Sequence, residues 1–211
     1  MIGPLDAVTA FHNAFRRDVS MIDAAALDLA RGKPGSESTL QRYRFFNEML
    51  AWHAHGEELA VFPALDRVAP LVSEPYLADH RGLDAASDAL SAAVSAKDAL
   101  ATARATAAYK FHLDIHLRKE DAHVYRLMRE RVSVPDQATV VGIMAGAVPK
   151  ERFADAVTWL FPLLGIPDRE NVTRIWQTLL PPPAFAGTVQ LIKSAIGDGW
   201  AELARRIPEL A

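Results

Sequence analysis

Two stretches of the sequence place a glutamate four residues after a histidine. His53 and Glu57 form the first pair, and His116 and Glu120 repeat the spacing further along the chain. Residues four apart share one face of an α-helix, so each pair can present a nitrogen and an oxygen to the same point. A buried imidazole or carboxylate is costly unless it is paired or bound, which predicts a partner for both pairs.

The histidines are confined to the first part of the chain. The seven are His12, His53, His55, His80, His112, His116 and His123. The chain has no cysteine, which excludes disulfides, thiolate nucleophiles and cysteine-held zinc or iron–sulfur sites. Any metal must therefore be held by histidine, aspartate, glutamate or tyrosine side chains.

The pattern of apolar residues predicts an all-α protein. Alanine and leucine dominate where a sheet would need valine, isoleucine and threonine, and no hairpin signal is present. Spacing and breakers predict four long helices, over roughly residues 4–30, from the RGKPGSES turn to about 66, 74–96 and 100–131. Short connections make neighbouring helices antiparallel, so we expect an up-down-up-down four-helix bundle.

The register of such a bundle brings histidines from all four predicted helices together. Residues that are equidistant from a connecting turn lie at one level along the bundle axis. The midpoint between His12 and His53 falls in the first predicted turn, and that between His80 and His116 falls where the third helix loses its phase. These four imidazoles should therefore meet Glu57 and Glu120 at one level.

Four imidazoles and two carboxylates suit borderline or harder transition metals, and two carboxylates can bridge two ions. A single zinc ion would leave ligands over, so di-iron, di-manganese or a mixed pair is expected. The fourth helix also places His112 and His123 on the face of His116 and Glu120. The register of ligation there could slip by one turn, and His112 or His123 is a candidate for a fifth nitrogen ligand.

These motifs resemble those of the hemerythrin-like HHE cation-binding proteins. The similarity is carried by HAHGEELAVFPAL, where the matched residues are His53, Glu57, Glu58 and Pro63. A weaker copy is HLRKEDAHVYRL, where they are His116, Glu120 and Asp121. His12 and His80 complete the set, and the resemblance covers about residues 7–131.

The resemblance implies a bundle around a non-haem di-iron centre. Two iron ions with an oxo or hydroxo bridge would be joined by Glu57 and Glu120. The terminal ligands would be His12, His53, His80 and His116.

This sequence departs from the oxygen-carrying hemerythrins in two places. Those proteins place two histidines one turn apart on the third helix, whereas here His80 is followed at that spacing by Asp84. Their last helix uses an aspartate five residues after the histidine, a place held here by Asp121 with Glu120 before it. A missing imidazole either opens a coordination position or is replaced by an oxygen ligand. Open positions favour activation of peroxide or NO over reversible release of O2.

Three functions follow for this site. The first is a di-iron centre that binds O2, NO or hydrogen peroxide, with catalase- or peroxidase-like turnover of the last. The second is an iron or oxygen sensor, or an O2- or iron-binding module without turnover. The third is a helical interaction protein with incidental histidines, which would bind no metal.

Other polar residues are expected beside the ligands. His55 lies off the face of His53 and should be at the surface, and Glu58 should lie outside the ligand set. Asp84 and Asp121 could orient metal-binding imidazoles, as neighbouring carboxylates commonly do. Tyr43, Tyr109 and Tyr125 could each hydrogen-bond a ligand or approach an iron, but core packing is the default expectation for all three.

The SVPDQ stretch marks an expected boundary between a bundle domain, residues 1–132, and a C-terminal helical domain of unknown role, residues 133–211. No histidine follows the boundary, and glycine and proline occur often enough to allow only shorter helices, about four of them. The segment is apolar and should pack on itself or against the bundle.

Composition limits the partners and the compartment. The 26 acidic and 23 basic residues give a net charge of -3, and no stripe of lysine and arginine is present, so nucleic acid is not expected. The first residues lack a signal-peptide pattern, and no run reaches the ~20 apolar residues that cross a bilayer. We therefore expect a cytoplasmic protein with no nucleic-acid or membrane partner. The histidine and carboxylate site adds small diatomic molecules or peroxide as expected ligands.

Overall fold

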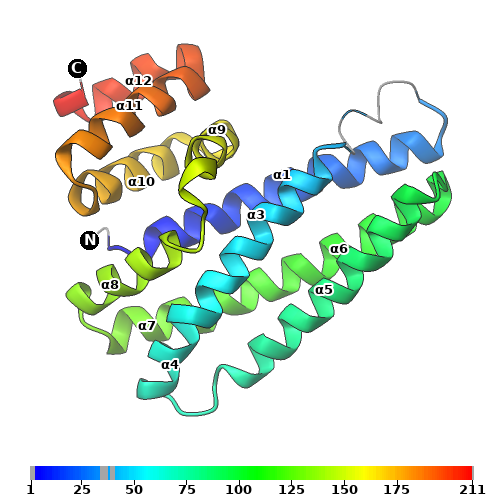
Figure 1. Cartoon of the computed structure of the whole chain (residues 1–211), viewed down its shortest axis with the longest axis horizontal. Coiled ribbons are helices and arrows are strands. Elements are labelled where there is room, and N and C mark those ends of the chain that lie inside the picture. Colours follow the sequence, from blue (N-terminus) through cyan, green and yellow to red (C-terminus); the bar gives the residue numbers. More distant parts are fainter. Residues whose placement is uncertain (1–2, 34–37, 39–40, 211) are drawn as a thin grey trace.

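The computed structural model (Figure 1) describes residues 3–33, 38 and 41–210, and these residues realise the helical periodicity of the sequence. Helices connected by short turns account for these residues, and no strand occurs among them. The prediction of an all-α helical bundle is confirmed.

Four long helical elements run alternately up and down (Figure 1). Each of the second and fourth elements consists of two α-helices joined by a π-helix. The elements are α1 (Asp6–Ala30); α3 (Tyr43–Gly56), η1 (Glu57–Val61) and α4 (Phe62–Val68); α5 (Glu74–Ser95); and α6 (Ala99–Lys119), η2 (Glu120–Val124) and α7 (Tyr125–Arg131). The most extensive packing joins α6 to α1 and to α5.

Both π-helices begin at a glutamate of the sequence motifs, Glu57 in η1 and Glu120 in η2. A π-turn is wider than an α-turn and occurs mostly as a single insertion at functional sites. Pro63 lies just after η1 and cannot donate a backbone hydrogen bond, which favours a wider turn there. No proline follows η2, so local sequence explains only one of the two.

The C-terminal segment forms more helices than the four that we expected. Its α-helices are α8 (Val134–Ala145), α9 (Phe153–Leu163), α10 (Ile166–Leu179), α11 (Pro182–Ile196) and α12 (Trp200–Arg206). Short 3₁₀ turns are η3 (Lys150–Arg152), η4 (Gly197–Gly199) and η5 (Pro208–Leu210). Gly197 explains the additional break, because its φ of 52° ends α11 in a conformation that favours glycine.

The C-terminal helices pack on the bundle through α1, which contacts α9 and α10, and through η1 and α3, which contact α8. Trp159 of α9 lies in one hydrophobic cluster with Phe15 of α1 and Phe46 of α3. Its indole Nε1 donates a hydrogen bond of 2.7 Å to Asp18, a buried carboxylate of α1. The division at residues 132 and 133 stays a prediction, although the two segments share this core.

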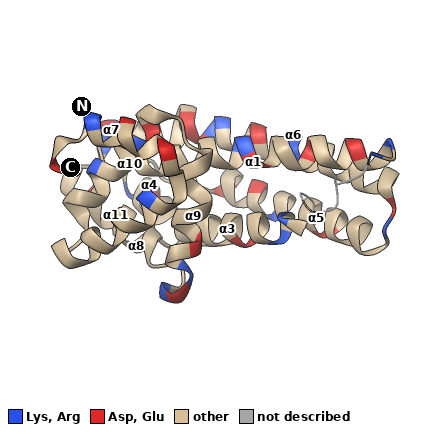
Figure 2. Cartoon of the chain, turned by 90° about the horizontal axis from the view of Figure 1, so that it is seen from above, with Lys and Arg blue, Asp and Glu red and all other residues tan. Residues whose placement is uncertain are grey.

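A second hydrophobic cluster lies further along the bundle, toward α4, α7 and α8, and includes Leu65, Met128 and Val140. Along the chain, His53 and His80 each fall between a residue of the first cluster and a residue of the second, so these polar side chains lie where the two apolar regions meet. Charged residues of both signs are interspersed on the long helices (Figure 2). Within the described ranges, no helix combines the length and the apolar character needed to span a bilayer.

Candidate metal centre

Six buried side chains meet in the interior of the bundle, one from each of α1, α3, η1, α5, α6 and η2. They are His12, His53, Glu57, His80, His116 and Glu120, the six residues that the sequence predicted to lie together. None of their side chains is more than 6% exposed. Their role as metal ligands stays a prediction, which the geometry below supports.

The first histidine pair consists of His12 and His53, whose Nε2 atoms lie 3.0 Å apart. Oε1 of Glu57 lies 3.2 Å from Nε2 of His53 and 3.7 Å from Nε2 of His12. Two nitrogens and one oxygen thus converge on one point, and an ion there could take all three.

The second histidine pair consists of His80 and His116, whose ring centroids are 4.8 Å apart. Oε2 of Glu57 lies 3.5 Å from Nε2 of His80, and Oε2 of Glu120 lies 3.3 Å from Nε2 of His116. Oε1 of Glu120 completes this group at 4.0 Å from His80. The group can therefore hold a second ion.

Each glutamate lies between the two histidine pairs. Glu57 directs one oxygen toward the first pair and the other toward His80. Glu120 approaches both pairs as well, because its Oε2 also lies 3.6 Å from Nε2 of His12. Carboxylates in this position are suited to bridge two cations.

Several polar atoms of the cluster lack a hydrogen-bond partner. They are both carboxylate oxygens of Glu120, Oε2 of Glu57 and Nε2 of His80. In the described part of the chain, no lysine or arginine forms an ion pair with either glutamate. A buried carboxylate without a partner costs several kcal/mol, so the arrangement fits bound cations.

The two glutamates have opposite electrostatic surroundings. Burial and the charge of Glu57 raise the pKa of Glu120 well above its ordinary value. Burial opposes ionisation of Glu57 too, but His53, His12 and His80 outweigh it and hold the pKa of Glu57 well below its ordinary value. Ionisation of both at once therefore calls for additional positive charge.

Each histidine pair contains one imidazole with a raised pKa and one with a lowered pKa. Burial lowers the pKa of all four, and it brings that of His116 to about 4. At His12 and His80, hydrogen-bonded carboxylates outweigh burial and raise the pKa.

Three of the four imidazoles donate Nδ1–H to a carboxylate outside the cluster. Asp121 accepts from His12 at 2.9 Å and Glu58 from His80 at 2.8 Å, while Asp79 lies 3.5 Å from Nδ1 of His116. This bond fixes the tautomer, so the lone pair of Nε2 faces the cluster.

In each of the two acidic pairs, Glu57–Glu58 and Glu120–Asp121, the two neighbouring carboxylates have different contacts. The first member of each points into the cluster and the second reaches an imidazole on another helix. Consecutive helical residues project in different directions, so both tasks require two adjacent acids. The sequence predicted this role for Asp121 and a place outside the ligand set for Glu58.

Tyr125 contacts a predicted ligand, the alternative that the sequence offered beside core packing. Its fully buried hydroxyl donates a short hydrogen bond to Oε1 of Glu57, and its ring packs edge-on to His12. Burial and the nearby carboxylates raise the pKa of Tyr125 well above its ordinary value, so the hydroxyl keeps its proton. The bond thus holds one of the two inward carboxylates in place.

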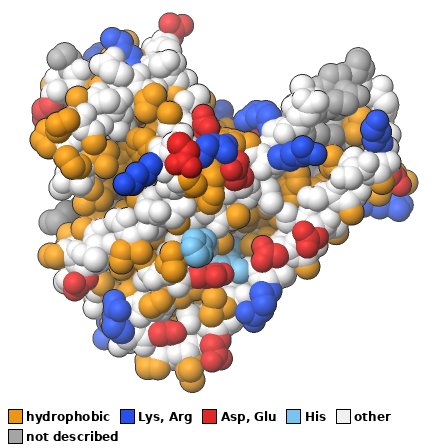
Figure 3. All heavy atoms as spheres, in the orientation of Figure 1, with side chains coloured by type: hydrophobic (Ala, Val, Ile, Leu, Met, Phe, Trp, Pro, Cys, Tyr) orange, Lys and Arg blue, Asp and Glu red, His pale blue; other side chains and the backbone are white. Residues whose placement is uncertain are grey.

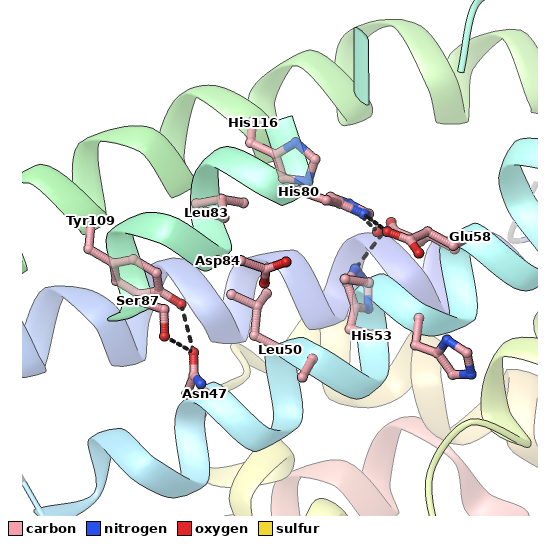
Figure 4. Close-up of a pocket in the computed structure, with 14 residues that line it drawn as sticks. Asn47, Leu50, His53, Glu58, His80, Leu83, Asp84, Ser87, Tyr109 and His116 are labelled. Carbon is pink, nitrogen blue, oxygen red and sulfur yellow. Dashed lines mark hydrogen bonds and ion pairs between the residues drawn. The ribbon is translucent and has the colours of Figure 1, made fainter. Parts of the chain in front are cut away.

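A cavity of about 250 Å³ lies between α3 and α5 and reaches the cluster (Figure 4). His53, His80 and His116 line it, and Figure 4 shows Glu58 pointing toward His80 at the same end. The other end is formed by hydrogen-bonded side chains, Asn47, Ser87 and Tyr109. A small polar molecule could approach the cluster through this cavity.

The structure leaves the two alternative histidines outside the cluster. His112 is exposed because the buried positions nearby on α6 are Tyr109 and Leu113. His123 is exposed because the wider turns of η2 rotate it away from the face of His116.

Of the flanking residues, His55 is exposed, as expected. Asp84 is exposed and lines the cavity, but no hydrogen bond joins it to an imidazole in the described part of the chain. Asp79, which belongs to no sequence motif, is the carboxylate that accepts a hydrogen bond from the imidazole of His116. Its position directly before His80 was the available signal, since acidic neighbours also flank Glu57 and Glu120.

Comparisons with known proteins give distant relatives. No family model matches the chain, and no solved structure matches it. The chain is 24% identical over 187 residues to Zinc finger protein BRUTUS of Arabidopsis thaliana, and 23% and 22% identical over 194 and 203 residues to two BRUTUS-like proteins of the same plant. These matches cover 82–85% of this chain but only 15–16% of each relative. Since the chain has no cysteine, the similarity does not rest on a cysteine-held zinc finger.

Proposed function

We propose that this protein is a hemerythrin-like, non-haem iron protein that holds two iron ions between its two histidine pairs. The observation that carries the proposal is the position of Glu57 and Glu120, buried between the pairs with three of their four oxygens lacking a hydrogen bond. One ion would use His12, His53 and Glu57, and the other His80, His116 and Glu120. The choice of iron over manganese follows the resemblance of the motifs to hemerythrin-like proteins.

Bound iron supplies a Lewis acid and a redox partner for O2, NO or hydrogen peroxide. The chain supplies the rest. The outer carboxylates hold the imidazoles with Nε2 toward the cluster, and Tyr125 holds Glu57 by its hydroxyl proton. Two apolar clusters exclude water on either side, and the cavity beside His80 admits a small molecule.

Peroxide turnover, catalase- or peroxidase-like, is the first form of this function. The third helix offers one imidazole, His80, and the place one turn later belongs to the exposed Asp84. The cavity lies on this side of the cluster, so an open coordination position there would face incoming peroxide.

Iron or oxygen sensing without turnover is the second form, and one contact favours it. The helix α8 packs directly on η1, which carries Glu57. At the adjoining Gly56, a Cβ would lie only 3.1 Å from the backbone of Met144 in α8, so the two helices are in close contact. A change in metal occupancy that shifts Glu57 would be transmitted to the C-terminal helices.

The test is metal analysis of protein purified without a metal-affinity tag. We expect about two irons per chain, little manganese or zinc, and a near-ultraviolet ligand-to-iron charge-transfer band that responds to peroxide. His53→Ala should lose the band, and His55→Ala, its exposed neighbour, should keep it. Less than half an equivalent of iron after anaerobic loading with Fe(II) would contradict the proposal. Consumption of hydrogen peroxide, measured with and without an added electron donor, then separates turnover from sensing; oxygen evolution identifies the catalase-like reaction.

A further inference from the structure

A second cavity, of about 340 Å³, lies where the C-terminal helices meet the bundle. Its walls come from α1, α3, α8, α9 and the end of α10. Figure 3 shows hydrophobic side chains gathered in this part of the surface. The size is within the range of small-molecule sites, which are mostly apolar with a few placed polar groups.

The lining of this cavity excludes ionised ligands. Four aromatic side chains contribute to it, Phe11, Trp52, Phe153 and Trp176. Among the described residues that line it, none is an aspartate, glutamate, lysine or arginine. A charged molecule would lose its hydration here without gaining an ion pair, so the cavity selects neutral molecules.

The polar groups of the lining include donors without acceptors. The indole N–H groups of Trp52 and Trp176 have no hydrogen-bond acceptor in the described part of the chain. Nδ1 of His53 also has none, whereas the other three imidazoles of the cluster each have a carboxylate at this atom. When Nε2 of His53 presents its lone pair to the cluster, Nδ1 carries the proton and is a third donor.

We propose that this cavity binds a neutral, largely aromatic small molecule that carries a carbonyl oxygen, a ketone or a quinone. The aromatic walls bury its rings, and its oxygen accepts a hydrogen bond from the unpaired donors. The site is separate from the peroxide-facing cavity, but both are lined by His53. A ligand here would therefore contact an imidazole of the cluster without occupying the cluster itself.

The test compares acetophenone with ethylbenzene, a slightly smaller alkylbenzene that lacks the carbonyl oxygen. Binding is followed by the methyl NMR signals of Met49 and Met144, which line the cavity, with Met21 and Met128 as internal controls. We expect the first two signals to shift and the controls to stay in place. We also expect acetophenone to bind at least as tightly as ethylbenzene, because the donors replace the hydrogen bonds that its carbonyl leaves in water. Tighter binding of ethylbenzene, or no shift at Met49 and Met144, would overturn the proposal.

A blocking variant locates the site. A side chain at Gly142, which lines the cavity, would start in open space, so Gly142→Phe should fold and weaken acetophenone binding by about tenfold or more. Ile143→Phe, at an exposed position next to it that does not line the cavity, is the matched control and should bind normally. If Gly142→Phe fails to fold, Ala145→Leu, on the same wall, replaces it. Unchanged binding in the folded blocking variant would contradict the site.

The proposal does not rest on iron. Binding is measured in metal-free and iron-loaded protein, so failure of the ligand site and failure of the iron centre give different results. Acetophenone binding without metal supports the cavity alone.

Discussion

The two acidic pairs of the cluster occupy equivalent places but have different surroundings. Glu57 and Glu120 each begin a π-helix and follow a histidine by four residues. Each is followed by an acid that holds an imidazole of another helix, Glu58 for His80 and Asp121 for His12. The repeated motif thus builds two halves of one centre.

The surroundings differ at the inward carboxylates. Glu57 accepts a hydrogen bond from Tyr125, borders the cavity and has a lowered pKa. Glu120 is fully buried, neither of its oxygens has a hydrogen-bond partner, and its pKa is raised. The protein itself supplies groups that stabilise ionised Glu57, whereas ionised Glu120 has no hydrogen-bond partner, so the same motif has two different electrostatic surroundings.

Replacing the inward carboxylates should have the largest effect. On the proposed function, Glu57→Gln and Glu120→Gln should each lower iron affinity more than about 100-fold, since each would remove a charged oxygen placed between the two proposed ion sites. Stability of the metal-free protein should separate them. Glu57→Gln should lower the free energy of unfolding by about 1–3 kcal/mol, whereas Glu120→Gln should maintain or raise it. Metal analysis and urea unfolding measure both effects, and equal stability changes would contradict the difference between the halves.

The outer carboxylates should have an intermediate effect. Asp121→Asn and Glu58→Gln should each lower iron affinity by about 10- to 100-fold, because they weaken the bond that orients an imidazole. The loss should be larger for Asp121→Asn, since Asp121 also pairs with Arg16 and is less exposed, 30% against 42% for Glu58. Competition with a chelator gives the affinities. Wild-type affinity in both variants would show that these carboxylates do not position the imidazoles.

Removal of the tyrosine hydroxyl should affect one half only. Tyr125→Phe should lower the free energy of unfolding by about 1.5–3 kcal/mol, the range for a hydrogen bond to a charged group, while the protein keeps its iron. Tyr109→Phe is the matched control, because Tyr109 is also buried but donates to Asn47 at 3.4 Å. Thermal unfolding and iron content check the result, and a larger loss in the control would argue against a special role for Tyr125.

The exposed histidines should have the smallest effect. His112→Ala and His123→Ala should leave iron content unchanged and shift the free energy of unfolding by no more than about 0.5 kcal/mol, since both side chains are at the surface. Metal analysis of the two variants is sufficient. Loss of iron in either would restore the alternative ligand set.

The sequence predicted the bundle and the meeting of the six side chains because both depend on regular spacing. His53 and Glu57 share a helix face because the chain between them is α-helical up to the start of η1. The antiparallel register of the four long helices then brings this pair to the level of the other predicted ligands. The π-helix η2 was not predictable, because its wider turn has no local marker such as the proline that follows η1. That turn also defeats the spacing argument that placed His123 on the ligand face.

Side-chain contacts between helices that lie apart in the sequence could not be predicted from the pattern within one helix. The support of His116 by Asp79 depends on how α5 packs on α6, and apolar periodicity cannot specify such a pairing. The shared core of Trp159 and Phe15 is equally non-local, since it joins residues that lie far apart in the sequence. Apolar content predicted that the C-terminal segment packs, but not which helix it contacts.

The most direct test of the central claim is a low-temperature Mössbauer spectrum of the full chain, loaded anaerobically with ⁵⁷Fe(II) and then oxidised. Two ferric ions that share Glu57 and Glu120 are expected to be magnetically coupled, which predicts quadrupole doublets with a diamagnetic ground state and about two irons per chain. A magnetically split spectrum from isolated ferric iron, at one iron per chain or fewer, would contradict a centre shared between the two halves.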